Sequence, residues 1–412
     1  MSVSITSSST QIGLVPITSS TQDLANIAVK AAKSSRRISR AASDLAQLRL
    51  SKTSLHGRDG EIKLLRSKLR DLPRDREDDD DEGTMASNLI LVSGKSGTGK
   101  STLINQGLGK PAKDYGYTFA KGKFDQNLRR RPLSAFSDAM ASLCRYIRKS
   151  NCAALIEEKI LNEFDSELRE QLLRVLPGCG GLFGLTSLAQ ERDDISLSTT
   201  SSVSASFRRH SFTVTGAEAI ARTQYAVRRL LKIICSHLKG VILFIDDLQW
   251  SDKATLDILS SIVLDRDIPK LTIVGAYRED EVNEQLTSFI QDLQEMDVSK
   301  IQINVGNLST NDVTSYIAEA LRMDEGDSKV ETLARIIHKK TEGNPFFVSI
   351  FLTSLYDDKI LQYNFGTMRW SWDDDVVESR TVTDNVASVL VNKMSRLKEE
   401  RAKILFEIFC AF

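Results

Sequence analysis

The sequence predicts an α/β fold, in which a doubly wound parallel sheet is followed by a smaller helical lid subdomain. Short apolar runs at 89–93, 241–245 and 271–276 are typical of buried parallel strands, and they alternate with stretches of helical periodicity. A glycine-rich segment at 94–101 connects the first run to a helical stretch. From residue 309 onward the pattern becomes helical, which separates a second unit from the sheet.

The composition indicates a protein of ordinary globular character. The chain has 412 residues, enough for two or three domains, and its 55 basic and 55 acidic residues cancel, so no overall charge attracts nucleic acid. No apolar run reaches the roughly 18 residues that a membrane span needs. The five cysteines lack CxxC spacing and the four histidines are dispersed, which argues against a Cys/His metal site. Reduced thiols in the cytoplasm, or in the nucleus, fit this pattern.

Residues 1–53 are rich in Ser and Thr and carry an excess of basic side chains, which predicts a flexible N-terminal segment. Two interpretations are open: a solvated tail with one transient helix, or a transit peptide for an organelle. Ser39 in this segment, and Ser211 further along the chain, each follow an arginine pair. Basophilic kinases favour such sites, so both serines are candidates for phosphorylation.

Residues 54–306 are expected to form the core that contains the sheet. A helix from about residue 58 to Pro73 precedes an acidic loop at 77–87, which leads into the first strand. Further elements are expected as strands at 117–120 and 301–305 and as helices at 133–148, up to 176 and at 217–238. Residues 177–216 open with Pro-Gly-Cys-Gly-Gly and become dense in Ser and Thr, which predicts a flexible insertion that buries no core.

Residues 307–360 are expected to form the helical lid, with helices at 313–321, 330–340 and 345–355. The remainder, 361–412, begins with a hairpin whose turn lies at Asn364-Phe365-Gly366 and continues into a further helical region. Its last helix is strongly apolar, and we expect it to pack on the lid, on a partner protein or a second copy, or on further chain.

Residues 94–101, GKSGTGKS, match the motif of a phosphate-binding loop, the Walker A motif. Its glycines let the backbone turn so that successive N–H groups point at phosphate oxygens, with a helix N-terminus behind them. Lys100 can reach the β- and γ-phosphates, and the Ser101 hydroxyl can bind Mg²⁺. The nucleotide is therefore expected to contact Gly94, Lys95, Ser96, Gly97, Thr98, Gly99, Lys100, Ser101 and Thr102. The alternative is a surface turn that matches by chance, and the apolar strand before the motif argues against it.

A second candidate element, of Walker B form, ends in two carboxylates, because the apolar run 241–245 leads directly into Asp246 and Asp247. Asp246 is expected to hold Mg²⁺, through water or together with Ser101. Asp247 is expected to orient or polarise the water that attacks the γ-phosphate. Because its side chain is one methylene shorter than the Glu common in fast ATPases, we expect slow turnover. The alternative is a core strand that runs into an acidic turn.

Six segments in order, from about residue 54 to 410, together resemble a known family of ATPases. They are LHGRDGE at 55–61, the phosphate-binding loop, GKFDQ at 122–126, DDLQWSD at 246–252, YREDEV at 277–282 and EGNPFF at 342–347. This set resembles the AAA-type ATPase domain similar to origin-recognition-complex ATPases. That domain occurs in large signalling proteins of the signal-transduction group within the P-loop NTPase superfamily.

The resemblance implies further site residues. Gly57 and Arg58 would lie near the adenine, and Pro345 in the lid would touch the base. Arg278, at the end of the 271–276 strand, would be a catalytic sensor that faces the γ-phosphate. Two local alternatives stand beside these roles: Arg278 can form a surface ion pair with Glu279 or Glu281, and a proline at 345 suits the first turn of a helix.

We therefore expect a chain that binds ATP and Mg²⁺, hydrolyses ATP slowly with Lys100, Asp247 and Arg278, and acts as a conformational switch in signal transduction. ATP, rather than GTP, follows from the resemblance, since no guanine-reading Asn-Lys-x-Asp string occurs. A protein partner or self-association through the lid and C-terminal helix is expected. Two other functions are open: a DNA-associated ATPase, for which only the basic N-terminus speaks, and a scaffold that binds ATP without turnover.

Overall fold

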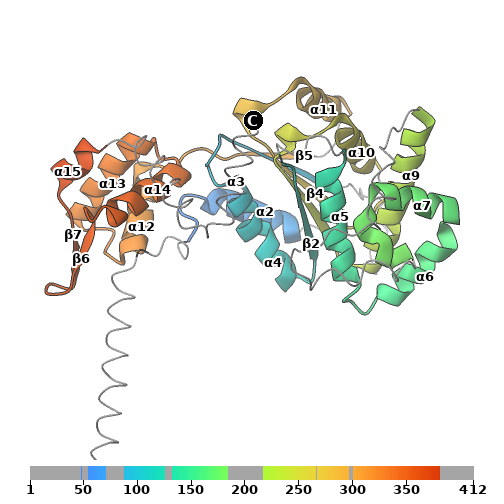
Figure 1. Cartoon of the computed structure of the whole chain (residues 1–412), viewed down its shortest axis with the longest axis horizontal. Coiled ribbons are helices and arrows are strands. Elements are labelled where there is room, and N and C mark those ends of the chain that lie inside the picture. The colour runs from blue at the N-terminus through green and yellow to red at the C-terminus, as the bar shows by residue number, and fades with distance from the viewer. Residues whose placement is uncertain are drawn as a thin grey trace, which may run out of the picture.

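A computed structural model describes residue 48 and residues 54–70, 88–125, 132–183, 217–265, 267–296 and 300–380 of the chain. These ranges form two lobes that lie side by side in Figure 1. The larger lobe contains a parallel sheet with helices on both faces, and the smaller lobe is mainly helical. The predicted α/β fold class is confirmed.

The sheet has five strands in the order β2-β3-β4-β1-β5, and every neighbouring pair is parallel. The strands are β1 (Asn88–Ser93), β2 (Thr118–Lys123), β3 (Val241–Asp246), β4 (Leu271–Ala276) and β5 (Lys300–Asn304). Strand β4 lies between β1, which leads into the phosphate-binding loop, and β3, which ends at the two carboxylates. The order therefore brings the C-terminal ends of these three strands together at one edge, where parallel sheets bind their ligands.

Side chains of the strands alternate between two hydrophobic clusters, one on each face of the sheet. Ile90 and Val92 face helices α2–α4, whereas Leu89 and Leu91 face the cluster built with α5, α6, α7, α9, α10 and α11. These helices are α2 (Asp59–Arg70), α3 (Lys100–Ile104), α4 (Lys110–Asp114), α5 (Ser134–Ile147), α6 (Ala153–Glu163), α7 (Ser166–Val175), α9 (Ala217–His237), α10 (Lys253–Val263) and α11 (Glu284–Glu295). A sheet covered on both faces explains why its strands read as continuous apolar runs.

The helix after the phosphate-binding loop is longer than its glycines suggest. A π-helical turn, η2 (Asn105–Gly109), joins α3 to α4, so Gly107 lies inside one helical stretch that ends at Asp114. The sequence alone marks Gly107 as the first helix breaker, but its position packs against Leu65 of α2, where a larger residue would be crowded.

The expectation that the whole of 177–216 is a flexible insertion is wrong for its first seven residues. They form a short helix, η4 (Pro177–Phe183), in which Cys179, Leu182 and Phe183 are buried in the main core. Gly178 fits closely against Ala141 of α5. Burial of these three apolar side chains stabilises the segment, although its glycine-rich composition predicts flexibility. Residues 184–216 lie outside the described residues, as do residues 77–87 and 381–412, for which the sequence predicts an acidic loop and a further helical region.

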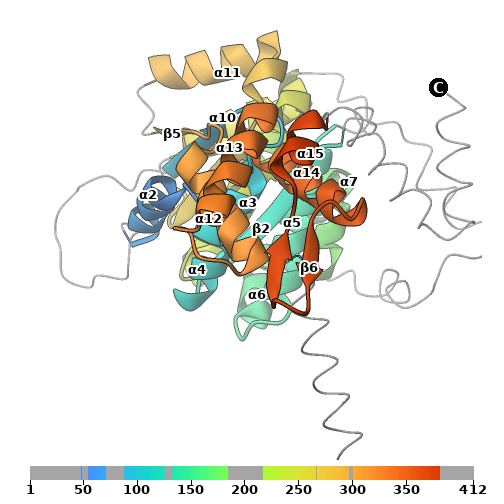
Figure 2. The same cartoon turned by 90° about the vertical axis from the view of Figure 1, so that its left-hand side faces the viewer.

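The smaller lobe contains the lid helices α12 (Thr310–Leu321), α13 (Ser328–Thr341) and α14 (Pro345–Asp357), followed by strands β6 (Gln362–Asn364) and β7 (Arg369–Ser371) and helix α15 (Asp374–Ser379). Figure 2 shows the hairpin and α15 beside α13 and α14. Trp370 and Val377 are buried in the same hydrophobic cluster as the lid helices, and Leu48 packs against it. The residues from 361 to 380 therefore share the core of the lid.

Candidate functional site

The phosphate-binding loop closes over its own lysine. Lys100 Nζ donates to the carbonyl oxygens of Gly94 at 2.7 Å and Lys95 at 2.8 Å, and the residue is only 8% exposed. Burial, together with the positive charge of Arg278, lowers the pKa of Lys100 from its ordinary value, although Asp247 and Asp246 act in the opposite direction. The two carbonyl oxygens are neutral and only partly offset the cost of burying the charged ammonium group. Such a group favours an anionic ligand.

Ser101 and Asp246 form a matched pair of oxygen donors beneath the loop. Ser101 Oγ donates to Asp246 Oδ1 at 2.9 Å, and Asp246 is 2% exposed. Among the described residues, its second oxygen has an ion-pair contact with Lys121 Nζ at 3.3 Å but accepts no hydrogen bond. A hydroxyl beside a carboxylate with an unsatisfied buried oxygen fits a hard cation such as Mg²⁺.

Asp247 is held in an unusual backbone conformation at the end of β3. Its φ of 60° and ψ of 47° lie in the left-handed region, which Asp tolerates better than most residues. Its Oδ2 lies 3.0 Å from Lys123 Nζ, and its Oδ1 accepts from Gln249 Nε2 at 3.1 Å. Burial alone would lower the pKa of Lys123, but the hydrogen bond and charge of Asp247 outweigh it and hold that pKa above its ordinary value.

Gln249 connects the carboxylate strand to its neighbour. Its Nε2 contacts Asp247, and its Oε1 accepts from the backbone N–H of Arg278 at 3.1 Å. The residue is 1% exposed and lies in the short helix η5 (Leu248–Trp250). Since Arg278 follows β4, this side chain fixes the spacing between the ends of β3 and β4.

Arg278 lies at the end of β4, as expected, and makes several contacts. Its Nε is 3.9 Å from Asp247 Oδ1, its Cζ lies 5.0 Å from the centre of the Trp250 ring, and its Nη1 pairs with Glu281. The local alternative, an ion pair with Glu281, is therefore present alongside the approach to Asp247. The sensor role stays a prediction.

Gly57 and Arg58 lie between the phosphate-binding loop and the lid. The Arg58 side chain is 7% exposed, and its guanidinium group donates to the carbonyl oxygens of Thr98, at 3.4 Å, and Gly306. Gly57 has a φ of +63°, and a Cβ there would lie 2.4 Å from the carboxyl carbon of Asp312 in α12. Only glycine allows this approach, so the segment is positioned against the lid. Contact of either residue with adenine stays a prediction.

The N-terminus of α14 touches the loop directly. Asn344 Nδ2 donates to the carbonyl oxygen of Ser96 at 2.9 Å, and Phe346 N donates to that of Gly97 at 3.3 Å. Pro345 occupies the first turn of α14 beside these contacts, as the local alternative predicts. Its predicted contact with the base is a separate matter and stays a prediction.

Four polar residues of this site had no role assigned from the sequence: Lys121, Lys123, Gln249 and Asn344. Lys123, Gln249 and Asn344 belong to three of the six segments that resemble the ATPase family, at 122–126, 246–252 and 342–347. The resemblance therefore marked their segments, but the sequence did not show which residues each side chain contacts. Strand order supplies that geometry, because β2 pairs with β3 and places Lys123 opposite Asp246.

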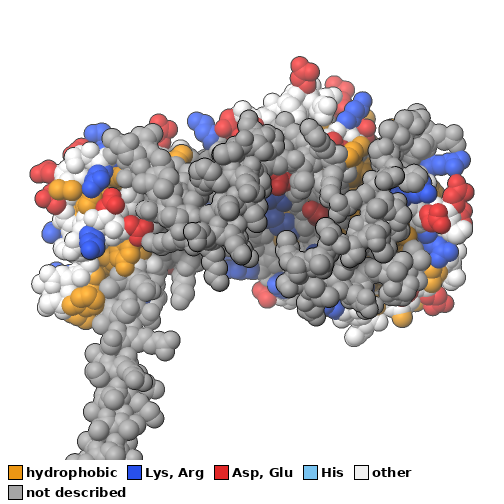
Figure 3. Space-filling view, in the orientation of Figure 1, with side chains coloured by type: hydrophobic (Ala, Val, Ile, Leu, Met, Phe, Trp, Pro, Cys, Tyr) orange, Lys and Arg blue, Asp and Glu red, His pale blue; other side chains and the backbone are white. Residues whose placement is uncertain are grey.

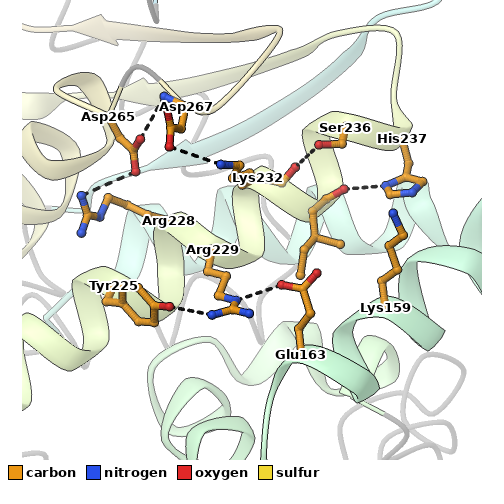
Figure 4. A pocket seen from close by; sticks show the side chains of 11 residues that line it. Lys159, Glu163, Tyr225, Arg228, Arg229, Lys232, Ser236, His237, Asp265 and Asp267 are labelled. Atoms are coloured by element: carbon orange, nitrogen blue, oxygen red, sulfur yellow. Dashed lines mark hydrogen bonds and ion pairs between the residues drawn. The ribbon is translucent and has the colours of Figure 1, made fainter.

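A cavity of about 530 Å³ lies elsewhere, between α6, α9 and the segment after α10, as Figure 4 shows. Three of its four lysine and arginine side chains face carboxylates of the chain itself, in the ion pairs Arg229–Glu163 at 2.9 Å, Arg228–Asp265 at 3.5 Å and Lys232–Asp267 at 3.3 Å. The phosphate-binding loop contributes nothing to its lining. Because its charges are largely compensated within the protein, this cavity does not compete with the loop as a phosphate site.

Comparison with known proteins yields a family match and two relatives. The sequence model described as AAA ATPase domain matches residues 54–274, more than half of the chain. Hybrid signal transduction histidine kinase G of Dictyostelium discoideum is 22% identical over 385 residues, covering 78% of this chain and 10% of that protein. Peroxide stress-activated histidine kinase mak3 of Schizosaccharomyces pombe is 25% identical over 379 residues, covering 77% of this chain and 15% of that protein. The chain thus spans a small part of these relatives.

Solved structures with a similar arrangement share little sequence with the chain. A Walker-type ATPase of Pyrococcus abyssi is 13% identical, with a TM-score of 0.39, over 84% of this chain and 76% of that one. The ORC2 protein of Aeropyrum pernix, in ADPNP–ADP complexes, is 11% identical, with a TM-score of 0.43, over 81% of this chain and 69% of that one.

None of the helices within the described ranges has the length and apolarity that crossing a membrane requires.

Proposed function

Because the chain belongs to the AAA ATPase domain family, we propose that it binds ATP with Mg²⁺, hydrolyses it slowly and works as a nucleotide-dependent conformational switch in signal transduction. One observation carries this proposal: the loop that holds Lys100 and Ser101 meets Asp246 on one side and the lid residue Asn344 on the other. Nucleotide chemistry and lid position therefore depend on the same few residues.

Each residue of the site has a distinct part in this mechanism. Lys100 exchanges its two carbonyl partners for the β- and γ-phosphates, which relieves the cost of its burial. Ser101 and Asp246 hold Mg²⁺, which supplies positive charge to the phosphates. Asp247 orients the attacking water, and Arg278 approaches the γ-phosphate from the end of β4.

The switch is the contact between lid and loop. Asn344 and Phe346 donate hydrogen bonds to the backbone of Ser96 and Gly97. A phosphate-binding loop that rearranges around phosphate therefore changes the position of α14. Ser54 and His56 also hold α12, through Glu319, just before Gly57 and Arg58. We place the adenine near Gly57, Arg58 and Pro345, where core and lid meet.

A signalling role is supported by the two relatives, both named as histidine kinases. We propose a cytoplasmic protein whose output passes to a partner or a second copy through the lid. Figure 3 shows hydrophobic side chains at the lower left of the lid, and Phe365 and Met368 of the hairpin are each 56% exposed. On the same face, the Lys, Arg, Asp and Glu side chains of the described residues are interspersed over both lobes. The charge distribution on this face of the described residues does not favour the alternative of a DNA-associated ATPase.

The test measures affinity for a fluorescent ATP analogue and phosphate release at saturating ATP. We expect the unmutated chain to bind ATP and release phosphate slowly, Lys100→Ala to lose binding, and Asp247→Ala to bind without release. Lys159→Ala, on the exposed face of α6, is the matched control and should leave both unchanged. If the unmutated chain bound ATP but released no phosphate, the protein would be a scaffold that binds ATP without turnover. Absence of binding would contradict the proposal altogether.

A further inference from the structure

Two buried cysteines of the larger lobe lie in direct contact, outside the candidate nucleotide site. Cys144 in α5 donates from its Sγ to the Sγ of Cys179 in η4 at 2.9 Å, and the two residues are 1% and 0% exposed. They are 35 residues apart in the sequence, and α6 and α7 lie between their elements. Neither thiol has a part in the proposed reaction, so this contact has no explanation in the chemistry of the nucleotide.

The glycines of η4 allow this contact. A Cβ at Gly178 would lie 2.3 Å from Cβ of Ala141, and a Cβ at Gly181 would lie 3.1 Å from Cδ of Arg148. Ala141, Cys144 and Arg148 have the i, i+3, i+7 spacing of one helix face, so η4 lies along that face of α5. Glycines on either side of the η4 cysteine let its backbone approach the helix closely, and the two sulfurs meet as a result.

The chemistry open to the pair is that of two thiols. Among the residues that the structure describes, no group of three or more His, Cys, Asp or Glu side chains could hold a metal ion, so the pair does not belong to a metal site. The hydrogen bond with Cys144, together with burial, raises the pKa of the Cys179 thiol well above its ordinary value. Cys179 therefore stays protonated, and Cys144 is the sulfur that reacts first with an oxidant.

We propose that Cys144 and Cys179 are a modification site, at which hydrogen peroxide forms a reversible disulfide between α5 and η4. This inference goes beyond the proposed function and does not depend on nucleotide binding. Both sulfurs are buried, so peroxide reaches them only when η4 opens transiently from α5, and oxidation is slow. Thiol reductants reopen the disulfide, as they do in the cytoplasm.

The reaction has two balanced steps. Cys144 attacks one oxygen of hydrogen peroxide, so that an S–O bond forms, the O–O bond breaks and hydroxide leaves as water with the proton of the Cys144 thiol. The Cys179 sulfur then attacks the sulfenic sulfur of Cys144, so that the S–S bond forms, the S–O bond breaks and a second water leaves with the Cys179 proton. The two thiols lose two electrons and the peroxide gains them. The contact with Cys179 lets the sulfenic acid react before it meets more peroxide.

The experiment treats the reduced full chain with hydrogen peroxide and follows its intact mass, its tryptic peptides without reduction, and its Tm. We expect the loss of two hydrogen atoms and a crosslinked pair of peptides that contains Cys144 and Cys179. Trypsin cuts after Arg145 and Lys149, which separates Cys144 from Cys152. Because the crosslink restricts the unfolded chain, we expect the Tm to rise by about 4 °C or more, and dithiothreitol to reverse both changes.

Three variants are compared by the difference in Tm between the oxidised and the reduced form of each. Cys144→Ala and Cys179→Ala are expected to lose the crosslink and the rise in Tm. Cys235→Ala is the matched control, because Cys235 in α9 is buried in the same hydrophobic cluster, and it should keep both. If either of the first two variants failed to fold, the mass and the peptides of the unmutated chain would still decide the question.

Several results would overturn the inference. A mass that stays unchanged after prolonged exposure to peroxide would show that the two thiols only pack against each other. A gain of two oxygen atoms on either cysteine would show that the sulfenic acid is not captured. A crosslink to Cys152, or a rise in Tm that persists in Cys144→Ala, would assign the oxidation to another site.

Discussion

Asn344 donates a hydrogen bond from its side-chain amide to the carbonyl oxygen of Ser96, across 248 residues of sequence and a distance of 2.9 Å. The same side chain caps helix α14, because its Oδ1 accepts from the backbone N–H groups of Phe346 at 3.1 Å and Phe347 at 3.4 Å. One residue therefore starts the lid helix and fastens it to the phosphate-binding loop. Gly97 leaves room for it, since a Cβ there would lie 2.7 Å from Asn344 Oδ1.

The two roles of Asn344, as helix cap and as donor to Ser96, can be separated by substitution. Asn344→Ala removes both, and we expect it to lower the free energy of unfolding by about 1–2 kcal/mol, the usual cost of losing a helix cap. Asn344→Asp keeps the cap acceptor but has no amide to donate to Ser96, so it should cost less. Urea denaturation of both variants checks this order. If Asn344→Asp proved as unstable as Asn344→Ala, the cap would contribute nothing.

Gln249 is expected to matter for both stability and turnover. Gln249→Ala leaves Asp247 Oδ1 without its hydrogen-bond donor and the Arg278 N–H without an acceptor, and we expect a loss of about 1–3 kcal/mol in the free energy of unfolding. Gln249→Glu keeps an acceptor for Arg278 but places a second carboxylate beside Asp247. It should therefore bind ATP yet release phosphate more slowly than the unmutated chain. Equal release rates, measured at saturating ATP, would show that Asp247 is positioned without Gln249.

The parts of the site that lie next to one another in the sequence could be predicted, and those joined only by the fold could not. Lys100 and Ser101 belong to one contiguous loop, and Asp246 with Asp247 ends one apolar run, so residue order alone indicates their chemistry. The position of Arg278 at a strand end follows in the same way. Asn344 and Ser96, by contrast, meet only because the lid folds back over the loop.

Strand order accounts for most of what the sequence left open. Lys123 could be placed beside Asp247 only by knowing that β2 pairs with β3, which no local pattern states. The same holds for 177–183, where glycine-rich composition predicted flexibility but Leu182 and Phe183 found a partner surface on the core. Composition indicates the structure that a segment favours in isolation. Burial against residues far away in the sequence can override that preference, as it does at 177–183.

Glu319 in α12 is expected to stabilise the junction between lid and core in a pH-dependent manner. Its carboxylate accepts from the backbone N–H of Ser54 at 3.0 Å and lies 2.7 Å from His56 Nε2. Burial alone would raise the pKa of Glu319, but these bonds outweigh it and hold the pKa below its ordinary value of 4.5. The junction holds the segment that carries Gly57 and Arg58, so its loss would also loosen the predicted adenine side of the site.

Because the pKa of Glu319 is lowered on folding, the folded chain binds fewer protons than the unfolded chain just below pH 4.5. The stabilising contribution is therefore complete above that pH and is lost as the pH falls through the lowered value. We expect the difference in unfolding free energy between the unmutated chain and Glu319→Gln to be constant near neutral pH and to shrink on acidification. Denaturation curves at a series of pH values measure this difference, with Glu158→Gln on the exposed face of α6 as control. A difference that stays constant at every pH would mean that the Glu319 carboxylate gains nothing from Ser54 and His56.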